Sequence, residues 1–150
     1  MMEVKMKSCC FFGHRDTPSC VGAALDDLLS NLVAQGVTCF YVGCEGAFDA
    51  LVLCALKKLQ KRFPHIVYRI VLAYIPVKTS PFLPEDASCT LFPEGIENVP
   101  PKYAVLRRND WMVAHADVVV CYVSRQWGGA AQSVSKACRQ GKPILNLFRP

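Results

Sequence analysis

Apolar residues follow two different spacings along the chain, and their alternation predicts strands and helices in regular order. Short apolar runs that end at glycine or polar residues predict buried strands, and apolar residues recurring every three or four positions predict amphipathic helices. The pattern predicts five strands, at about residues 9–12, 38–42, 66–74, 117–123 and 143–148. It predicts four helices, at about residues 25–33, 48–59, 102–115 and 129–140.

This order predicts an α/β fold, because a helix between two strands is the usual crossover of a parallel sheet. The run V-V-V-C-Y-V at 118–123 is apolar throughout, as is typical of a strand covered on both faces. We therefore predict a single doubly wound, Rossmann-like domain over residues 1–150, with about five mostly parallel strands and helices on both faces. A proline-rich stretch at about 76–101 holds six of the ten prolines and is predicted as a long loop, a lid or an oligomer contact.

Composition narrows the class of protein. No apolar run approaches the roughly 20 residues that a membrane helix needs, and the apolar stretch after the charged start is too short for a signal peptide, so we expect a cytoplasmic protein. Nine cysteines without a C-x-x-C pair argue against a disulfide framework, and the His and Cys spacing predicts neither a metal nor a cofactor. The net charge of +5 is moderate and includes a basic cluster at 57–62 typical of a solvated helix face, which argues against nucleic-acid binding.

Polar, glycine-bearing turns follow three of the predicted strands. In a doubly wound sheet the carboxyl ends of the strands form the ligand site. The residues concerned are Gly13, His14 and Arg15 after the first strand, Gly43, Glu45, Gly46 and Asp49 after the second, and Trp127, Gly128 and Gly129 after the fourth. Glycine lets backbone N–H groups approach a phosphate, but a tight strand-to-helix turn also favours glycine.

Each polar residue in these turns has a structural alternative. Glu45 is placed to bind ribose hydroxyls or to act as a nucleophile or base. The structural alternative is that the carboxylate of Glu45 or Asp49 caps the following helix. His14 and Arg15 lie in a turn that is expected to face the ligand. The structural alternative is that His14 forms hydrogen bonds within the turn and that Arg15 pairs with Asp16.

A basic pair, Arg107 and Arg108, lies in the first turns of the third predicted helix, followed by Asn109. The helix dipole disfavours cations there, so the pair requires an anion. That anion is either a ligand phosphate, with Asn109 adding amide hydrogen bonds, or a carboxylate of Asp110, Glu94 or Glu97. Trp111 and Met112 on the same helix are expected to pack in the core and not to stack on the base of a ligand.

At these residues the chain resembles the SLOG superfamily, the Rossmann-like group that includes the Lonely Guy cytokinin-activating phosphoribohydrolases and the DNA-processing protein A family. Within that group the likeness is to small YpsA-type proteins. The stretches that carry it are F-F-G-H-R-D-T-P, F-Y-V-G-C-E-G-A-F-D-A-L-V, P-H-I-V-Y-R-I-V-L-A-Y, P-E-G-I-E-N-V-P-P-K-Y-A-V-L-R-R-N-D-W-M-V and G-G-A-A-Q-S-V-S-K-A-C-R-Q-G-K-P-I-L-N-L. They cover nearly the whole chain.

The resemblance implies functional roles for several residues, but the sequence departs from the family's motif at three positions. Lonely Guy enzymes carry an Arg nine residues before an Asp, then P-G-G-x-G-T-x-x-E. Arg108 lies nine residues before Asp117, and Gly128 and Gly129 match the glycine pair. No proline precedes that pair, Ala131 replaces the third glycine, and Ser135 replaces the catalytic Glu.

These observations favour a binding protein for a nucleotide or an ADP-ribose-like molecule, acting as a sensor or sequestering module. The first alternative is an N-glycosidase acting on a nucleoside monophosphate, in which Glu45 would be the catalytic carboxylate. The second is a nucleic-acid-binding module of the DNA-processing type. The resemblance also implies a homodimer or a higher homo-oligomer.

Overall fold

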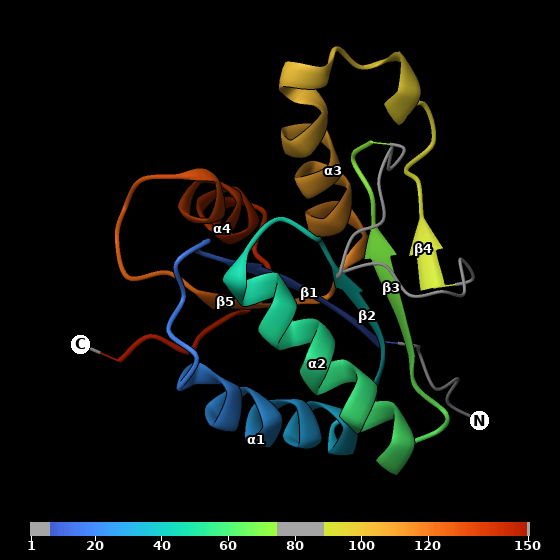
Figure 1. Ribbon diagram of the computed structural model, residues 1–150, viewed down its shortest axis with the longest axis vertical. Coiled ribbons are helices and arrows are strands. Elements are labelled where there is room, and N and C mark those ends of the chain that lie inside the picture. The colour runs from blue at the N-terminus through green and yellow to red at the C-terminus, as the bar shows by residue number, and fades with distance from the viewer. Residues whose placement is uncertain (1–6, 75–88, 150) are drawn as a thin grey trace.

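A computed structural model describes residues 7–74 and 89–149 of the chain (Figure 1). The described residues form a six-stranded sheet in the order β4-β3-β2-β1-β5-β6, with every strand pair parallel. The strands are β1 (Lys7–Gly13), β2 (Val37–Val42), β3 (Val67–Val71), β4 (Thr90–Leu91), β5 (Val118–Tyr122) and β6 (Ile144–Asn146). The helices are α1 (Val21–Ala34), α2 (Ala47–Arg62), α3 (Pro101–His115) and α4 (Gly129–Arg139), with a short 3-10 helix η2 (Ile96–Asn98) before α3.

The helices form two layers with the sheet between them (Figure 1). Successive residues of a strand point to opposite faces of the sheet, and the central strand β1 supplies apolar side chains to both. Cys9 and Phe11 enter the core under α1 and α2, whereas Cys10 and Phe12 enter the core under α3 and α4. The predicted α/β fold with helices on both faces is therefore confirmed, and the continuous apolar runs are explained by this double coverage.

The chain changes direction at β1, and this change places the site. From β1 the chain winds outward through β2, β3 and β4, then returns to the other side of β1 to form β5 and β6. The loops that follow β1 and β5 consequently diverge to opposite faces and leave a crevice at the carboxyl ends of these strands. Ligands of open α/β sheets bind in such crevices.

The stretch predicted as a loop at about 76–101 is a loop only in part. Positions 75–88 lie outside the described residues. The remainder contains β4, whose Leu91 carbonyl accepts a hydrogen bond from Leu72 N–H at 2.9 Å, and η2. A two-residue strand is too short to show a spacing pattern, which is why the sequence predicted five strands instead of six.

The third predicted helix also needs a correction. Arg107 and Arg108 are the seventh and eighth residues of the 15-residue helix α3, beyond the first turn where the dipole acts on charges. The predicted dipole penalty is therefore wrong, and the environment of Arg108 must be explained by its tertiary contacts. In the described ranges, no helix is long and apolar enough to cross a membrane.

Candidate functional site

A cavity of about 380 Å³ lies at the carboxyl ends of β1, β2 and β5; we call it the site pocket. Ten of the predicted ligand-binding residues line it, namely Gly13, His14, Arg15, Gly43, Glu45, Asp49, Arg108, Asn109, Gly128 and Gly129. Phe11, Phe12, Val105 and Met112 add apolar walls. The pocket thus combines an apolar lining with a few convergent polar groups, as small-molecule sites do.

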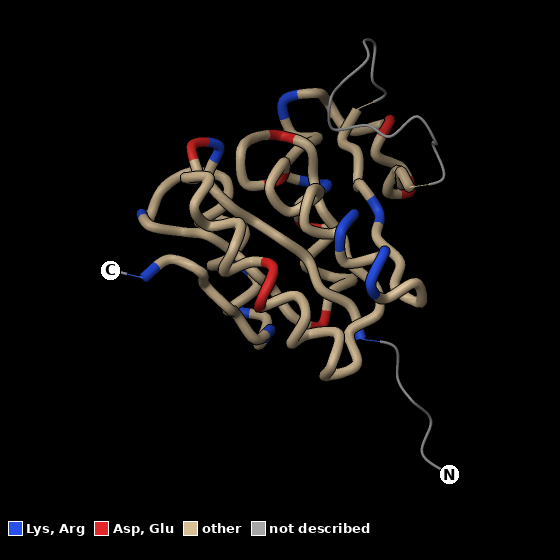
Figure 2. The backbone as a smooth tube through the Cα atoms, turned by 60° about the horizontal axis from the view of Figure 1, so that its bottom comes forward, with Lys and Arg blue, Asp and Glu red and all other residues tan. Residues whose placement is uncertain are grey.

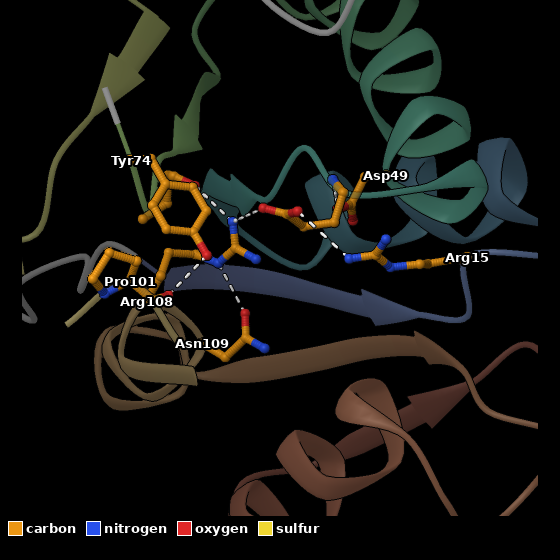
Figure 3. Close-up of polar contacts among 8 residues, drawn as sticks. Arg15, Asp49, Tyr74, Pro101, Arg108 and Asn109 are labelled. Atoms are coloured by element: carbon orange, nitrogen blue, oxygen red, sulfur yellow. Dashed lines mark hydrogen bonds and ion pairs between the residues drawn. The ribbon is translucent and has the colours of Figure 1, made fainter. Parts of the chain in front are cut away.

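Arg108 is the central polar group of the pocket, and its side chain is only 3% exposed (Figure 3). Its Nε donates to Asn109 Oδ1 at 2.9 Å, and its Nη1 donates to the carbonyl oxygen of Val71 at 3.1 Å and to Glu45 Oε1 at 3.3 Å. These bonds fix the plane of the guanidinium group. The Cys44 thiol also forms a side-chain hydrogen bond with Arg108, and Arg108 lines the cavity.

Glu45 pairs with two arginines from different elements. Besides the contact with Arg108, its Oε2 lies 3.8 Å from Nη2 of Arg15, whose side chain is 77% exposed (Figure 3). The predicted alternative, an Arg15–Asp16 pair, is not what the structure contains. Because the Arg15 pair is long and exposed to solvent, it contributes little to stability, and Arg15 remains free to turn toward a ligand.

Asp49 lies in the first turn of α2 and links the helix to the turn before it. Its Oδ2 accepts a hydrogen bond from the backbone N–H of Glu45 at 2.9 Å, one residue before the cap position Gly46. Burial raises the pKa of the Asp49 carboxyl to about 6, while the hydrogen bond from Glu45 and the charge of Arg108 act in the opposite direction. The cap position Gly46 has no side-chain cap hydrogen bond, and the Asp49 carboxylate instead binds the N–H that precedes this position.

His14 is buried and satisfied. Its Nε2 accepts a hydrogen bond from the backbone N–H of Ser124 at 3.0 Å, which joins the turn after β1 to the turn after β5. Burial lowers the pKa of His14, and the charge of Arg125 lowers it further. The neutral ring with its proton on Nδ1 fits this hydrogen bond, so His14 holds the two turns together while lining the pocket.

Arg125 is a pocket residue that the sequence-based selection missed. Its two terminal nitrogens donate to the two carboxylate oxygens of Asp16, at 3.2 and 3.0 Å, across the mouth of the crevice. The same guanidinium group lies 5.7 Å from the ring centre of Trp127. Its position in a polar turn after a predicted strand was the available signal, but the pairing spans 109 residues of sequence and needs the tertiary structure.

The Gly128–Gly129 turn contributes backbone instead of side chains. Gly128 adopts φ +99°, which favours glycine, and Gly129 begins α4. The first helical hydrogen bond recorded here runs from Gln132 N–H to the Gly128 carbonyl, so the N–H groups of residues 129–131 precede the hydrogen-bonded ladder. Such N–H groups, with the positive end of the helix dipole, favour an anion.

Three predicted residues do not line the site pocket. Gly46 packs against Arg15, with 2.7 Å between the place of a Cβ and Arg15 Cα. Arg107 is exposed on the outer side of α3, and Trp127 lies in a neighbouring hollow. Ser135, which stands where the resemblance places a catalytic Glu, lines that hollow too. Asp110, one proposed partner of the arginines, pairs instead with Lys136 at 2.8 Å.

The charges around the pocket nearly cancel. Arg15, Arg108 and Arg125 face Glu45, Asp49 and Asp16. An anion therefore gains from the arginines only by competing with the protein's own carboxylates. Within the described part of the chain, no cluster of three or more His, Cys, Asp and Glu residues has the arrangement of a metal site.

Comparison with known proteins identifies the fold. No protein-family model matches the chain, and no curated protein matches it in sequence. The structure is similar to DNA processing protein A from Streptococcus pneumoniae, with a TM-score of 0.69 and 13% identity over 95% of this chain and 50% of that one. It is also similar to the Moco carrier protein from Chlamydomonas reinhardtii, with a TM-score of 0.62 and 14% identity over 97% and 79%.

The chain spans about half the length of the DNA processing protein A structure. Both likenesses extend over nearly the whole of this chain. The parallel sheet, the reversal of strand order at β1 and these two likenesses show that the chain has a Rossmann-like fold.

Proposed function

We propose that this protein binds a nucleotide or a nucleotide-derived, ADP-ribose-like small molecule in the site pocket, as a sensor or sequestering module. The observation that carries the proposal is the buried Arg108 guanidinium, which lines the site pocket and is held in place by three internal hydrogen bonds. A charged donor fixed in a water-poor wall makes stronger hydrogen bonds to an anion than one in solvent.

Two further features support a phosphorylated ligand. The free N–H groups at the start of α4 line the same cavity as Arg108, and Arg15 and Arg125 stand at its mouth. When the anion of a ligand binds the arginines, it replaces part of their pairing with Glu45. Glu45 can then accept hydrogen bonds from ribose hydroxyls. The volume of about 380 Å³ lies at the lower end of the usual range for ligand pockets, which suits a ligand of mononucleotide size.

The test is isothermal titration calorimetry with AMP, ADP-ribose and NAD, with chromatographic analysis of each ligand after incubation. Arg108→Ala is expected to weaken binding about 10- to 100-fold, the usual value of a charged hydrogen bond. Arg107→Ala is the matched control, because it removes the same charge from the next, exposed position of α3. Equal affinity in both variants, or no ligand among those tested, would contradict the proposal.

An N-glycosidase acting on a nucleoside monophosphate is the second candidate, favoured by the two carboxylates, Glu45 and Asp49, that line the pocket. A carboxylate beside the anomeric carbon would stabilise an oxocarbenium-like centre or attack it. Ser135 has no carboxylate where the resemblance places the catalytic Glu, and this departure supports binding without turnover. Release of free base from AMP, abolished in Glu45→Gln with binding retained, would instead establish the glycosidase.

Nucleic-acid binding has the least support. Lys and Arg lie at several separate places along the backbone, interspersed with Asp and Glu (Figure 2). A module that reads DNA through its phosphates needs a basic stripe and loses affinity steeply with salt. A titration with duplex and single-stranded DNA at two salt concentrations, with a steep loss of affinity between them, would favour this function over the proposed one.

A further inference from the structure

A second cavity, which we call the outer hollow, adjoins the site pocket. It has a volume of about 550 Å³ and is lined by Gln126, Trp127, Gln132 and Arg139, among others. It shares Gly128 and Gly129 with the site pocket, so the two cavities meet at this turn. The turn at the start of α4 is thus bordered by a cavity on each side.

The ridge between the two cavities is bare backbone. A Cβ placed on Gly128 or Gly129 would have no described atom within 4 Å, so the space above the ridge is open. Packing does not demand a glycine at 129, and its φ is not in the left-handed region. The absence of side chains here leaves a passage by which one ligand can occupy both cavities.

Trp127 lines the outer hollow and is not part of the hydrophobic core. It is 70% exposed, the most exposed of the large hydrophobic residues in the described ranges, and its recorded ring contact is with Arg125. Arg125 in turn lines the site pocket, so the ring and the pocket are linked by one side chain. An exposed indole beside a polar cavity is suited to stack on a planar ring of a ligand.

We propose that the outer hollow is a second subsite that takes a planar heteroaromatic group, such as a nucleobase, stacked on Trp127. The phosphate of the same ligand occupies the site pocket, and its sugar crosses the Gly128–Gly129 turn. The amides of Gln126 and Gln132 offer donors and acceptors to the edge of the ring. The inference rests on the proposed function and names the ligand class more closely: an anion joined through a sugar to a flat ring.

Calorimetric titration with AMP and with ribose 5-phosphate separates the two subsites, because the second probe lacks the ring. Trp127→Ala is expected to weaken AMP binding about tenfold and to leave ribose 5-phosphate unchanged. Trp127→Phe, which keeps a stacking face, is expected to restore most of the affinity. Gly129→Val, which raises a side chain on the ridge, is expected to weaken AMP more than ribose 5-phosphate.

The possible outcomes separate the inference from the proposed function. If Arg108→Ala weakens both probes while Trp127→Ala weakens neither, the site pocket stands as a phosphate site and the outer subsite is overturned. If neither probe binds the wild-type protein, the proposed function fails and the subsite fails with it. AMP should also quench tryptophan fluorescence, and since Trp127 is one of two tryptophans, the Trp127→Phe variant should lose that signal. Unchanged quenching in the variant would contradict stacking on Trp127.

Discussion

Two glycine-bearing turns follow strands at the same edge of the sheet, and the structure uses them in opposite ways. In the turn after β2, a Cβ on Gly43 would lie 3.0 Å from Nη1 of Arg108, and one on Gly46 would lie 2.7 Å from Cα of Arg15. In the turn after β5, a Cβ on Gly128 or Gly129 would meet nothing within 4 Å. The first turn is filled by the protein's own groups, and the second is open.

The comparison shows that the same residue type marks a close internal contact in one turn and an accessible backbone in the other. Gly43 and Gly46 make room for the guanidinium of Arg108 and for the backbone of the β1 turn. Gly128 and Gly129 leave the start of α4 accessible from two cavities. Only the second arrangement offers backbone N–H groups to a ligand, so the two turns should respond differently to substitution.

The largest expected effect is on the group that fills the first turn. Arg108→Ala should lower the free energy of unfolding by about 3 kcal/mol, because it removes three hydrogen bonds and leaves Glu45 with only its long contact to Arg15. The exposed Arg107→Ala should change the same quantity by less than about 0.5 kcal/mol. Urea denaturation followed by circular dichroism measures both, and equal stabilities would contradict the central role of Arg108.

Gly46→Ala should come next, with a loss of about 2 kcal/mol. Its Cβ would press on the Cα of Arg15, where the N–H of Ala47 donates to the Arg15 carbonyl at 3.0 Å, and backbone atoms cannot move aside as a flexible side chain would. Thermal unfolding of the variant measures the loss. A melting temperature equal to that of the wild type would show that the two turns are not packed differently.

Asp49→Asn should have a pH-dependent effect on the free energy of unfolding. The pKa of Asp49 is raised to about 6 in the folded protein, above its ordinary value of 3.8, so the native state binds the proton more tightly than the unfolded chain does. Its contribution is therefore favourable at low pH and is lost as the pH rises from about 4 to above 6. Asn keeps an oxygen acceptor for the Glu45 N–H, so the variant should match the wild type at pH 3.5 and exceed it at pH 8.

Denaturant titrations of Asp49→Asn and the wild type across this pH range give the difference directly. A constant difference would show that the burial of Asp49 does not perturb its titration. Glu45→Gln is a useful companion, since it changes the neighbouring carboxylate without removing the backbone N–H that donates to Asp49.

The smallest expected effect is in the open turn. Gly129→Ala should change the free energy of unfolding by less than about 0.5 kcal/mol, because the new methyl group meets no protein atom and helical residues favour alanine over glycine. The same melting measurement as for Gly46→Ala tests it. A loss similar to that of Gly46→Ala would remove the distinction between the turns.

Much of the fold follows from the chain itself. Apolar spacing predicted the four helices and five of the six strands. An element that is buried on one or both faces needs apolar residues at a regular spacing, and this spacing is visible in the sequence. The Rossmann-like fold that the resemblance implies is confirmed by the similar structures. The strand β4 was not predicted, because two residues are too few to show a spacing pattern. Its position depends on pairing with β3.

The sequence by itself determined the elements, their parallel order and the edge of the sheet at which polar turns gather, since these depend on local spacing and the rules of chain connection. The tertiary structure decided which of those polar residues meet. The Arg108–Glu45 pair spans 63 residues, and the His14–Ser124 bond spans 110. Whether a glycine is crowded or open depends on neighbours distant in sequence, because burial and close contact are properties of the packed chain.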